Sequence, residues 1–342
     1  MDVLIVKLAA LGDVLRTTSV VRRLKACRPE ARITWVTARA AVPLLEGNPD
    51  LERVLALEDQ PKLARKFELV LSLEEDKAAA ALALSSCSGE LIGVLGEGGL
   101  RYTGSSALYY DMSALNRDPD GSLKTADRLK AANKLGYARI WLKILGLPAP
   151  KKAEDLRPVL VLTDAERKAA ARGLCLTGAK TKLTSAIGLN AGAGKRWPAK
   201  QLSPEPAARL AEALSALERP VLLLGGADEA ARNREIIRRA ETPVVDAGTN
   251  RGLREFAALV SWLAALVTTD SLAFHVATAL GVPTVVLVGP TSASELELFG
   301  SGACVSPESC NCFYKPECTT PPSCLDRLEP ARVARAVKRL LS

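Results

Sequence analysis

Hydrophobic positions along the chain alternate between two patterns. Short runs rich in β-branched residues or leucine are each followed by a longer stretch rich in Ala, Leu and Arg. The first pair is the run from Val3 to Val6 and, after a turn with Gly12 and Asp13, an amphipathic stretch that continues to about Cys27. This alternation is typical of strand–helix–strand units, so it predicts an α/β protein built on parallel sheets.

The pattern predicts two such series, separated by a short segment that lacks it. Residues 146–158 form this segment, and their density of Pro and charge is typical of a linker. We therefore expect an N-terminal α/β domain over 1–150 that faces, across a cleft, a second α/β domain over 151–328, with a C-terminal helix over 329–342. Strands are expected at 3–6, 33–37, 54–57, 69–73, 91–95, 186–190, 221–224, 243–246, 265–269 and 284–288, with mostly helix over 123–147.

Composition agrees with a folded, two-domain protein. The chain has 342 residues, of which 48% are hydrophobic and 25% charged, an ordinary globular mix. No uninterrupted apolar run reaches the ~18 residues of a membrane-spanning helix. Lys7 also interrupts the first apolar run before it could form the core of a signal peptide. We therefore expect a cytoplasmic protein.

The balance of charges suggests which partners the protein binds. Lys and Arg total 46 against 38 acidic residues, a net charge of +8, which favours anionic partners such as nucleotide phosphates or phosphorylated lipids. The basic residues are spread along the chain, and only 4% of residues are aromatic. This is too few for the stacking surfaces of a single-strand nucleic-acid binder, so no nucleic-acid partner is expected.

Ligands of open α/β sheets bind at the carboxyl ends of the strands, so the residues after each strand are the candidates for a site. Gly12 and Asp13 lie in the segment after the first strand, where the next helix begins. Two interpretations of Asp13 are open. It could cap the helix, which aspartate does well, or it could be a general base.

A glycine-rich loop follows the strand that ends at Asn190. Gly192 and Gly194 precede Lys195, and such a loop allows backbone amides and a cation to approach phosphate oxygens. It is not a Walker A loop, because Arg196 stands where a Ser or Thr should hold magnesium. The alternative is a flexible loop with a solvated basic pair.

Two further loops carry polar residues at strand ends. Asp228 follows Gly225 and Gly226 and could bind ribose hydroxyls, although it or Glu229 could instead cap the next helix. Asp270 and Ser271 fall at a predicted helix N-terminus, which favours an anion such as a diphosphate. His275, the chain's only histidine, is either a packed structural residue or a functional one.

Five of the eight cysteines, beginning with Cys304, cluster near the C-terminus and need an explanation, because cytosolic proteins rarely keep structural disulfides. Cys310, Cys312, Cys318 and Cys324 could hold Zn²⁺ or iron as a structural site, although they lack the CxxC pairs of common zinc motifs. Disulfide or redox use and reduced thiols that pack a loop are the alternatives. Asp118-Pro119-Asp120 resembles a DxD metal motif, but its surroundings predict a turn.

The loops, taken in order, resemble a known family. The segments are VLIVKLAALGDVLRTTSVVRRL, GAGKRWP, GGADE and TDSLAFHVATALGVPTVVLVGPT, supported by LYYDMSALNRDPDGSLKTADRLK and CNCFYKPEC. They are similar to the signature segments of glycosyltransferase family 9, the ADP-heptose:lipopolysaccharide heptosyltransferases. The resemblance extends from residue 3 to about residue 340. It implies a GT-B fold of two Rossmann-like domains, with the acceptor site mainly on the first and the nucleotide-sugar site mainly on the second.

The resemblance also implies roles for single residues. The family's catalytic aspartate, which follows Gly12, falls on Asp13, and its phosphate-binding lysine falls on Lys195. Its ribose-binding acid falls on Asp228. The donor-site aspartate and histidine fall on Asp270 and His275. The chain departs from the family pattern at Leu272, where better-known members have Gly.

The function implied is inverting transfer of a sugar from a nucleotide donor. Asp13 would be the base, while Lys195, the loop from Gly192 to Gly194 and the helix start at Asp270 and Ser271 would hold the leaving diphosphate, so that catalysis needs no metal. The sugar implied is heptose from an ADP-heptose-like donor, and the acceptor is a lipopolysaccharide core at the inner leaflet. The rivals are a nucleotide-sugar epimerase and an inactive nucleotide-binding protein of the same fold.

Overall fold

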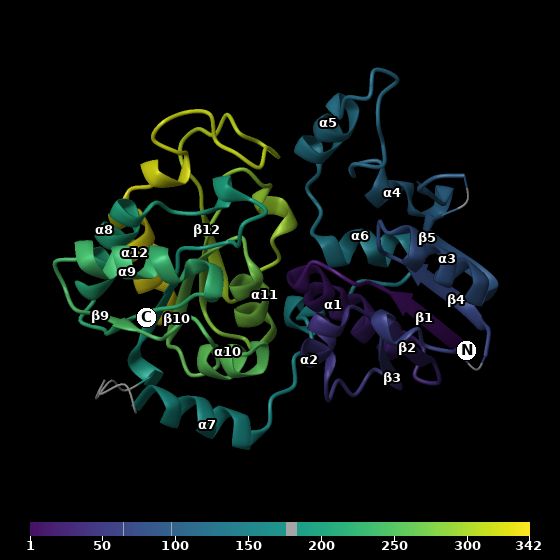
Figure 1. Ribbon diagram of the computed structural model, residues 1–342, viewed down its shortest axis with the longest axis horizontal. Coiled ribbons are helices and arrows are strands. Elements are labelled where there is room, and N and C mark those ends of the chain that lie inside the picture. Colours follow the sequence, from purple (N-terminus) through teal and green to yellow (C-terminus); the bar gives the residue numbers. More distant parts are fainter. Residues whose placement is uncertain (64, 97, 176–182) are drawn as a thin grey trace. The chain divides into compact units, whose positions relative to one another are not determined.

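The structure is a computed structural model that describes residues 1–63, 65–96, 98–175 and 183–342. The chain forms two compact units, Met1–Val161 and Leu162–Ser342. Each contains a six-stranded sheet with helices packed on it (Figure 1). The strand orders are β3-β2-β1-β4-β5-β6 and β12-β11-β10-β7-β8-β9, so both sheets have the Rossmann order. The α/β class with two parallel Rossmann-like sheets is therefore confirmed.

The sheet of the first unit is centred on β1, where Val3, Leu4, Ile5 and Val6 are each 0% exposed. A continuous apolar run fits this position, because a central parallel strand is covered on both faces. Strands β1 to β5 run parallel, while the short strand β6, which the hydrophobic pattern did not predict, runs antiparallel to β5. The strands are β1 Asp2–Val6, β2 Arg32–Thr37, β3 Arg53–Ala56, β4 Phe67–Ser72, β5 Cys87–Leu95 and β6 Arg101–Tyr102.

The helices of the first unit are α1 Leu11–Cys27, α2 Val42–Leu45, α3 Lys77–Ser86, α4 Ala107–Tyr110, α5 Lys124–Ala132 and α6 Tyr137–Ile144. The helical stretch expected over 123–147 is thus two helices. The break falls at Asn133, whose side chain accepts a hydrogen bond from the Leu135 amide at 3.0 Å and donates one to the Leu135 carbonyl at 2.9 Å. Asparagine favours such local bonds over helix continuation.

The Pro-rich segment 146–158 lies against α1 in the first unit. Arg23 donates to the Pro148 carbonyl at 2.6 Å, and the Thr18 hydroxyl accepts from the Val159 amide at 2.7 Å. Leu156 is buried. These contacts attach the segment to the first unit almost to its end.

The second unit repeats the same architecture. Its strands all run parallel, and β12, at the edge of the sheet, was not predicted. The strands are β7 Ile187–Asn190, β8 Val221–Leu223, β9 Val244–Asp246, β10 Ala265–Thr269, β11 Thr284–Leu287 and β12 Gly302–Val305. The helices are α7 Asp164–Cys175, α8 Pro204–Ser215, α9 Ala230–Arg239, α10 Leu253–Val260, α11 Leu272–Ala279 and α12 Pro330–Leu341.

Strand order decides which loops of the second unit meet. Strands β10, β7 and β8 are neighbours, so the loops that follow Thr269, Asn190 and Leu223 leave the same edge of the sheet side by side. The boundary between β7 and β10 is the topological switch point, where ligands of doubly wound sheets bind. Three of the loops that the sequence singled out therefore lie together.

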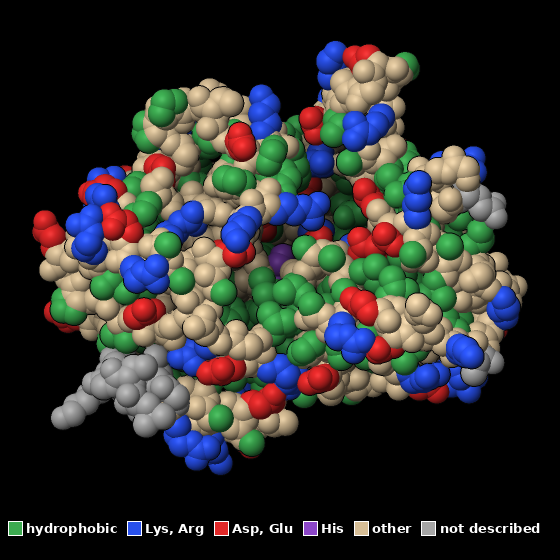
Figure 2. Space-filling view, in the orientation of Figure 1, with side chains coloured by type: hydrophobic (Ala, Val, Ile, Leu, Met, Phe, Trp, Pro, Cys, Tyr) green, Lys and Arg blue, Asp and Glu red, His purple; other side chains and the backbone are tan. Residues whose placement is uncertain are grey.

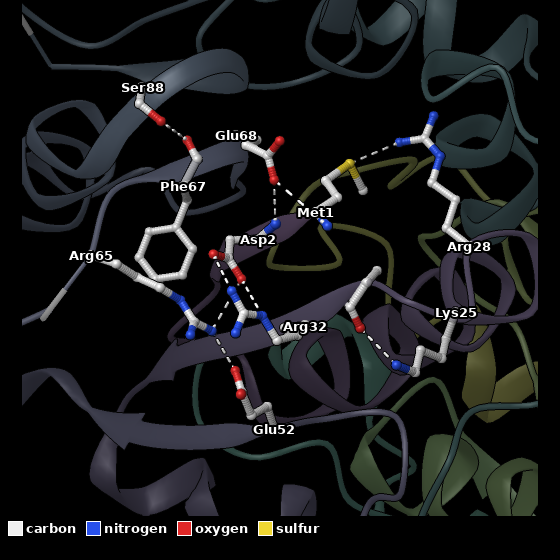
Figure 3. A network of polar contacts seen from close by, with 11 residues as sticks. Met1, Asp2, Lys25, Arg28, Arg32, Glu52, Arg65, Phe67, Glu68 and Ser88 are labelled. Carbon is white, nitrogen blue, oxygen red and sulfur yellow. Dashed lines mark hydrogen bonds and ion pairs between the residues drawn. The ribbon is translucent and has the colours of Figure 1, made fainter.

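The amino ends of the first sheet's strands carry a network of ion pairs (Figure 3). Arg32 binds both carboxylate oxygens of Asp2 at 2.8 Å, and Arg65 joins Asp2 at 3.3 Å and also pairs with Glu52. Glu68 accepts from the Asp2 amide at 2.7 Å. This network lies at the edge opposite the carboxyl ends of the strands, so we interpret it as structural.

Surface charge is mixed rather than concentrated. On the face in view, Lys and Arg side chains are interspersed with Asp and Glu (Figure 2). Across the described residues, no helix is both long and apolar enough to span a bilayer.

Candidate functional site

A pocket of about 410 Å³ lies at the switch point of the second sheet. It is formed by the loops after β7 and β8, the first residues of α11, and the segment that enters α10. The lining residues are Asn190, Gly192, Ala193, Gly194, Gly225, Gly226, Ala227, Asp228, Glu229, Arg251, Leu253, Phe256, Ser271, Leu272 and Ala273. We call it the glycine-loop pocket. It brings together five of the residues selected from the sequence: Asn190, Gly192, Gly194, Asp228 and Ser271.

The floor of the pocket is fixed by a buried hydrogen-bond network at the strand ends. The Asn190 side-chain amide donates to the Gly192 carbonyl at 3.0 Å and lies 3.2 Å from the Ser271 hydroxyl. The Thr269 hydroxyl donates to the same Gly192 carbonyl at 2.8 Å. Ser271 is the N-cap residue of α11. The network therefore ties the loop after β7 to the start of α11.

Glu229 joins the two glycine-containing loops, a role that the sequence did not indicate. One carboxylate oxygen accepts from the Gly194 amide at 3.0 Å and the other from the Gly226 amide at 2.8 Å. The side chain also lies against Gly192, where an added Cβ would sit 2.3 Å from the Glu229 Cγ. From the sequence, Glu229 is expected only as a helix cap. Nothing in its local sequence shows that its second oxygen reaches a loop 35 residues away.

Lys195 and Asp228 form an exposed ion pair at the rim of the pocket. The Lys195 ammonium lies 2.7 Å from a carboxylate oxygen of Asp228, and the two side chains are 82% and 48% exposed. The hydrogen bond that Lys195 donates to this carboxylate, together with the negative charge of Asp228, raises the pKa of Lys195. Such exposed pairs contribute little to stability, so both groups can turn towards a ligand at small cost.

Asp270 lies beside the pocket but does not line it. Its carboxylate accepts from the Lys200 ammonium at 2.7 Å and from the Thr291 hydroxyl at 3.0 Å, and the Asp270 and Lys200 side chains are only 13% and 17% exposed. Burial alone would raise the pKa of Asp270, but Lys200, His275 and Thr291 together hold it below its usual value. Asp270 is therefore an ionised, paired carboxylate. Lys200 was missed, because nothing in the sequence separates it from other surface lysines.

His275 lies on α11, one turn after Ser271, and is buried. Its ring stacks edge-to-face on Phe274 with centroids 5.0 Å apart. Like Asp270, it lies outside the lining of the glycine-loop pocket. Leu272, the departure from the family pattern, does line it.

In the first unit, Asp13 is not the helix cap considered above. The N-cap of α1 is Ala10, and Asp13 stands in the first turn, where it pairs with Arg16 at 2.9 Å and is 35% exposed. Arg16 in turn lies over the ring of Tyr137, 4.0 Å from its centroid. Gly12, also in the first turn, is buried.

Glu74 holds the loop that leads to Asp13. A single carboxylate oxygen of Glu74 accepts from the amides of Leu8 and Ala9, both at 2.9 Å, and from the Lys7 ammonium at 3.0 Å. Glu74 follows β4, the neighbour of β1. As with Glu229, a glutamate after the adjacent strand orders the loop that carries the candidate chemistry, and no local motif predicts this role.

The four C-terminal cysteines converge. The sulfur atoms of Cys310, Cys312 and Cys324 lie 2.8–3.1 Å apart, and Cys318 lies 3.6 Å from Cys324. All four are free thiols, and burial raises the pKa of Cys324 to about 11. Four thiolates bound to zinc at about 2.3 Å would lie about 3.8 Å apart. The donor set therefore fits a thiophilic metal after a small outward movement of the sulfurs.

Comparison with known proteins identifies the family. Residues 62–319 match the family described as glycosyltransferase family 9 (heptosyltransferase). The chain belongs to this family. Lipopolysaccharide heptosyltransferase 2 of Escherichia coli K12 is 26% identical to it over 305 residues, which cover 85% of this chain and 84% of that protein.

Solved structures of family members share the fold over nearly the whole chain. A family 9 glycosyltransferase of Veillonella parvula matches with a TM-score of 0.75 at 18% identity, over 99% of this chain and 97% of that one. E. coli ADP-heptose lps heptosyltransferase II matches with a TM-score of 0.68 at 23% identity, over 100% and 98%. The iron-containing dodecameric glycosyltransferase TibC of enterotoxigenic E. coli H10407 matches with 0.58 at 14% identity, over 99% and 75%. The GT-B fold implied by the sequence resemblance is confirmed.

Proposed function

We propose that this family 9 glycosyltransferase transfers heptose from ADP-heptose to a hydroxyl group of a lipopolysaccharide core, with inversion at the anomeric carbon. The observation that carries the proposal is the glycine-loop pocket, which combines a glycine-rich loop, a helix start and an exposed Lys–Asp pair. This combination suits a nucleoside diphosphate: amides and a cation for the phosphates, and a carboxylate for the ribose hydroxyls.

The donor side works by stabilising the leaving diphosphate. Negative charge develops on the phosphate oxygens as the anomeric bond breaks, and preformed donors aimed at that charge lower the barrier. In this proposal, Lys195, the loop from Gly192 to Gly194 and the start of α11 at Ser271 supply these donors, with Asp228 on the ribose and Asp270 and His275 on the sugar side. Because these groups can neutralise the diphosphate, the transfer needs no divalent metal.

Asp13 is the general base in this proposal. Inversion requires in-line attack by the acceptor hydroxyl, and a positioned carboxylate removes its proton as the new bond forms. The pairing with Arg16 orients Asp13, while Glu74 fixes the preceding loop. The acceptor is lipid-linked, so the enzyme works at the cytoplasmic surface of the inner membrane, where its net charge of +8 favours anionic headgroups.

The decisive test is incubation of the purified protein with ADP-heptose, with and without a heptose-deficient lipopolysaccharide core. A transferase releases ADP and extends the core only when both are present, and NMR of the product shows an inverted anomeric configuration. Conversion of the donor without an acceptor would instead identify an epimerase. Tight ADP binding without turnover on any core would identify a non-catalytic nucleotide-binding protein. Activity in the presence of EDTA tests the metal independence of the transfer.

The cysteine cluster supports a second, structural proposal. The four thiols hold one Zn²⁺ or iron ion, which fastens the loop before α12, as their convergence and burial suggest. TibC, which shares the fold, is described as iron-containing. Elemental analysis of the purified protein tests this: about one equivalent of zinc or iron is expected. Freely titratable thiols without any transition metal would refute it.

A further inference from the structure

The segment that contains the four cysteines is attached to the donor side of the second unit. We call residues 310–326 the cysteine segment. Ala199, only 3% exposed, packs directly against the thiols of the cluster. Ala199 is the middle residue of a 3₁₀ turn, η6 (Pro198–Lys200), which follows the glycine-rich loop and Lys195. The thiols therefore touch the very turn from which Lys200 extends.

Hydrogen bonds join the cysteine segment to the same region at three further places. The Ala199 amide donates to the Pro316 carbonyl at 2.8 Å, and the Tyr314 amide donates to the Pro290 carbonyl at 2.6 Å. The amide and hydroxyl of Ser203 donate to the two carboxylate oxygens of Asp326 at 2.8 and 2.6 Å. The cysteine segment thus contacts both the η6 turn and the loop after β11.

These two attachment points carry two of the residues that contact Asp270. Lys200 follows Ala199 directly, and Thr291 follows Pro290 directly. Their side chains meet on one carboxylate oxygen of Asp270, at 2.7 and 3.0 Å. Asp270 precedes Ser271, the N-cap of α11 that lines the glycine-loop pocket. A continuous set of contacts therefore leads from the thiols to the pocket.

We propose that a thiophilic metal ion on Cys310, Cys312, Cys318 and Cys324 sets the donor affinity of the enzyme by holding the η6 turn, so that Lys200 and Thr291 orient Asp270 at the start of α11. Lys200 is a positioning residue in this scheme, and the metal takes no part in the transfer. The inference rests on the proposed function for its link to the donor. The claim that the metal orders the η6 turn rests only on the contacts described above within the second unit.

The physical reason is that the four free thiols, two of them buried and two partly buried, attract one another only weakly. A metal ion would replace those contacts with four coordinate bonds, and the binding energy of such sites appears as order in the surrounding chain. Without the ion, the cysteine segment keeps its hydrogen-bonded attachments to the donor region and the core packing of Leu325, but the thiols beneath Ala199 lose their coordinate bonds. The η6 turn then loses its support, and a buried ion pair is sensitive to small changes in geometry.

The first experiment measures order without any ligand. Protein saturated with Zn²⁺ is compared with protein stripped by a chelator, and with Cys318→Ser, by hydrogen exchange and elemental analysis. We expect about one bound zinc, and faster exchange over residues 196–203 when it is removed, with α10 unchanged. Cys27→Ser, at the end of α1 in the first unit, is the matched control and should change neither metal content nor exchange.

The second experiment measures ADP affinity by calorimetry. Removal of zinc and Lys200→Met should each weaken ADP binding about tenfold, the scale of one charge-assisted bond. Because both act on the same turn, their effects should not add: stripping zinc from Lys200→Met should cost little more than either change alone. Lys200→Arg should restore most of the affinity, because it keeps the charge on Asp270.

Several outcomes would overturn the inference. They are a failure to bind zinc, unchanged exchange over 196–203 in the stripped protein, unchanged ADP affinity on stripping, or full additivity with Lys200→Met. Re-addition of Zn²⁺ must restore the native exchange, which separates local loosening from irreversible unfolding. If the zinc-saturated protein does not bind ADP at all, the proposed function fails, and the exchange measurement still decides whether the metal orders the turn.

Discussion

At the scale of single residues, the candidate functional residues are oriented by hydrogen bonds and ion pairs with neighbouring side chains. Asp13 is held by Arg16, and the loop before it by Glu74. Gly192 and Gly194 are held by Asn190 and Glu229. The reacting groups are therefore partly exposed, while the residues that place them are more buried. This arrangement separates chemistry from positioning, and substitutions can test the two roles independently.

Asp13→Asn should abolish transfer while it leaves ADP affinity within a few-fold of the native value. The amide keeps the shape and can still contact Arg16, but it cannot accept the proton of the acceptor hydroxyl. A positioned general base contributes ~10²–10⁴-fold to the rate. Steady-state transfer assays and ADP calorimetry check the two halves of the prediction. Activity above a tenth of the native level would show that Asp13 is not the base.

Lys195→Ala should weaken both nucleotide-sugar binding and turnover, roughly ten- to a hundred-fold in affinity, since charge-assisted hydrogen bonds are worth ~1.5–3 kcal/mol. Lys151→Ala is the matched control, because Lys151 is also exposed but lies in the Pro-rich segment, far along the chain from any glycine loop. Donor titrations of both variants compare them. Equally small effects would rule out a phosphate role for Lys195.

At the scale of elements, the glycine-loop pocket depends on how tightly the loop after β7 packs on Glu229. Gly192→Ala would place a Cβ 2.3 Å from the Glu229 Cγ, closer than real contacts allow. The loop must then shift, and ADP affinity should fall while the far-UV circular dichroism stays native. Gly252→Ala is the control: its Cβ would meet open space, and its φ of −65° suits alanine. Comparable losses in both variants would contradict this account.

Helix α7 is attached to α10 through a pH-dependent ion pair. Arg254 donates hydrogen bonds to both carboxylate oxygens of Glu166, and the amide and hydroxyl of Thr163 donate two more. These bonds lower the pKa of Glu166 from 4.5 to about 2, although burial acts in the opposite direction. Because the folded pKa lies below the unfolded one, the pair stabilises the fold above about pH 4.5. That stability is lost as the pH falls towards 2.

Glu166→Gln should therefore lower Tm by a few degrees at pH 7. The difference from the native protein should shrink between pH 4.5 and 2, where the native carboxyl becomes neutral as well. Thermal unfolding at a series of pH values measures this. Glu30→Gln, at an exposed position, should leave Tm unchanged throughout. A constant difference at all pH values would mean that the glutamate acts through packing rather than charge.

At the scale of the whole molecule, the hydrophobic pattern of the sequence predicts most of the strands and helices of the fold. Ten of the strands are visible in sequence, eight of them central strands, which need continuous apolar runs such as Val3 to Val6. β6 and β12 were not predicted because Arg101–Tyr102 has no apolar run and Gly302–Val305 contains only one β-branched residue. The break at Asn133 escaped because it depends on a local side-chain bond rather than on periodicity.

The site could be predicted only in part, for a related reason. Strand ends and glycines can be recognised in the sequence, and together they predict which loops bind a ligand. Residues in such loops were therefore predicted as site residues: Gly192, Gly194, Asp228 and Ser271. Glu229, Lys200 and Glu74 did not, because each acts on a loop that is remote in sequence. Their partners are decided by which strands are neighbours. That information belongs to the strand order, and no local motif contains it.

The attachment of residues 146–158 to α1 has a practical consequence for protein engineering. Every residue that lines the glycine-loop pocket belongs to the unit from Leu162 to Ser342, and the chain leaves the first unit only after Val159 is bound by Thr18. A hybrid enzyme that takes its halves from two family members should therefore be joined between Val161 and Leu162. A junction near residue 150, which the Pro-rich composition suggests, would separate α1 from part of the 146–158 segment that packs on it. Each half of the hybrid would then keep its own sheet and its own internal contacts.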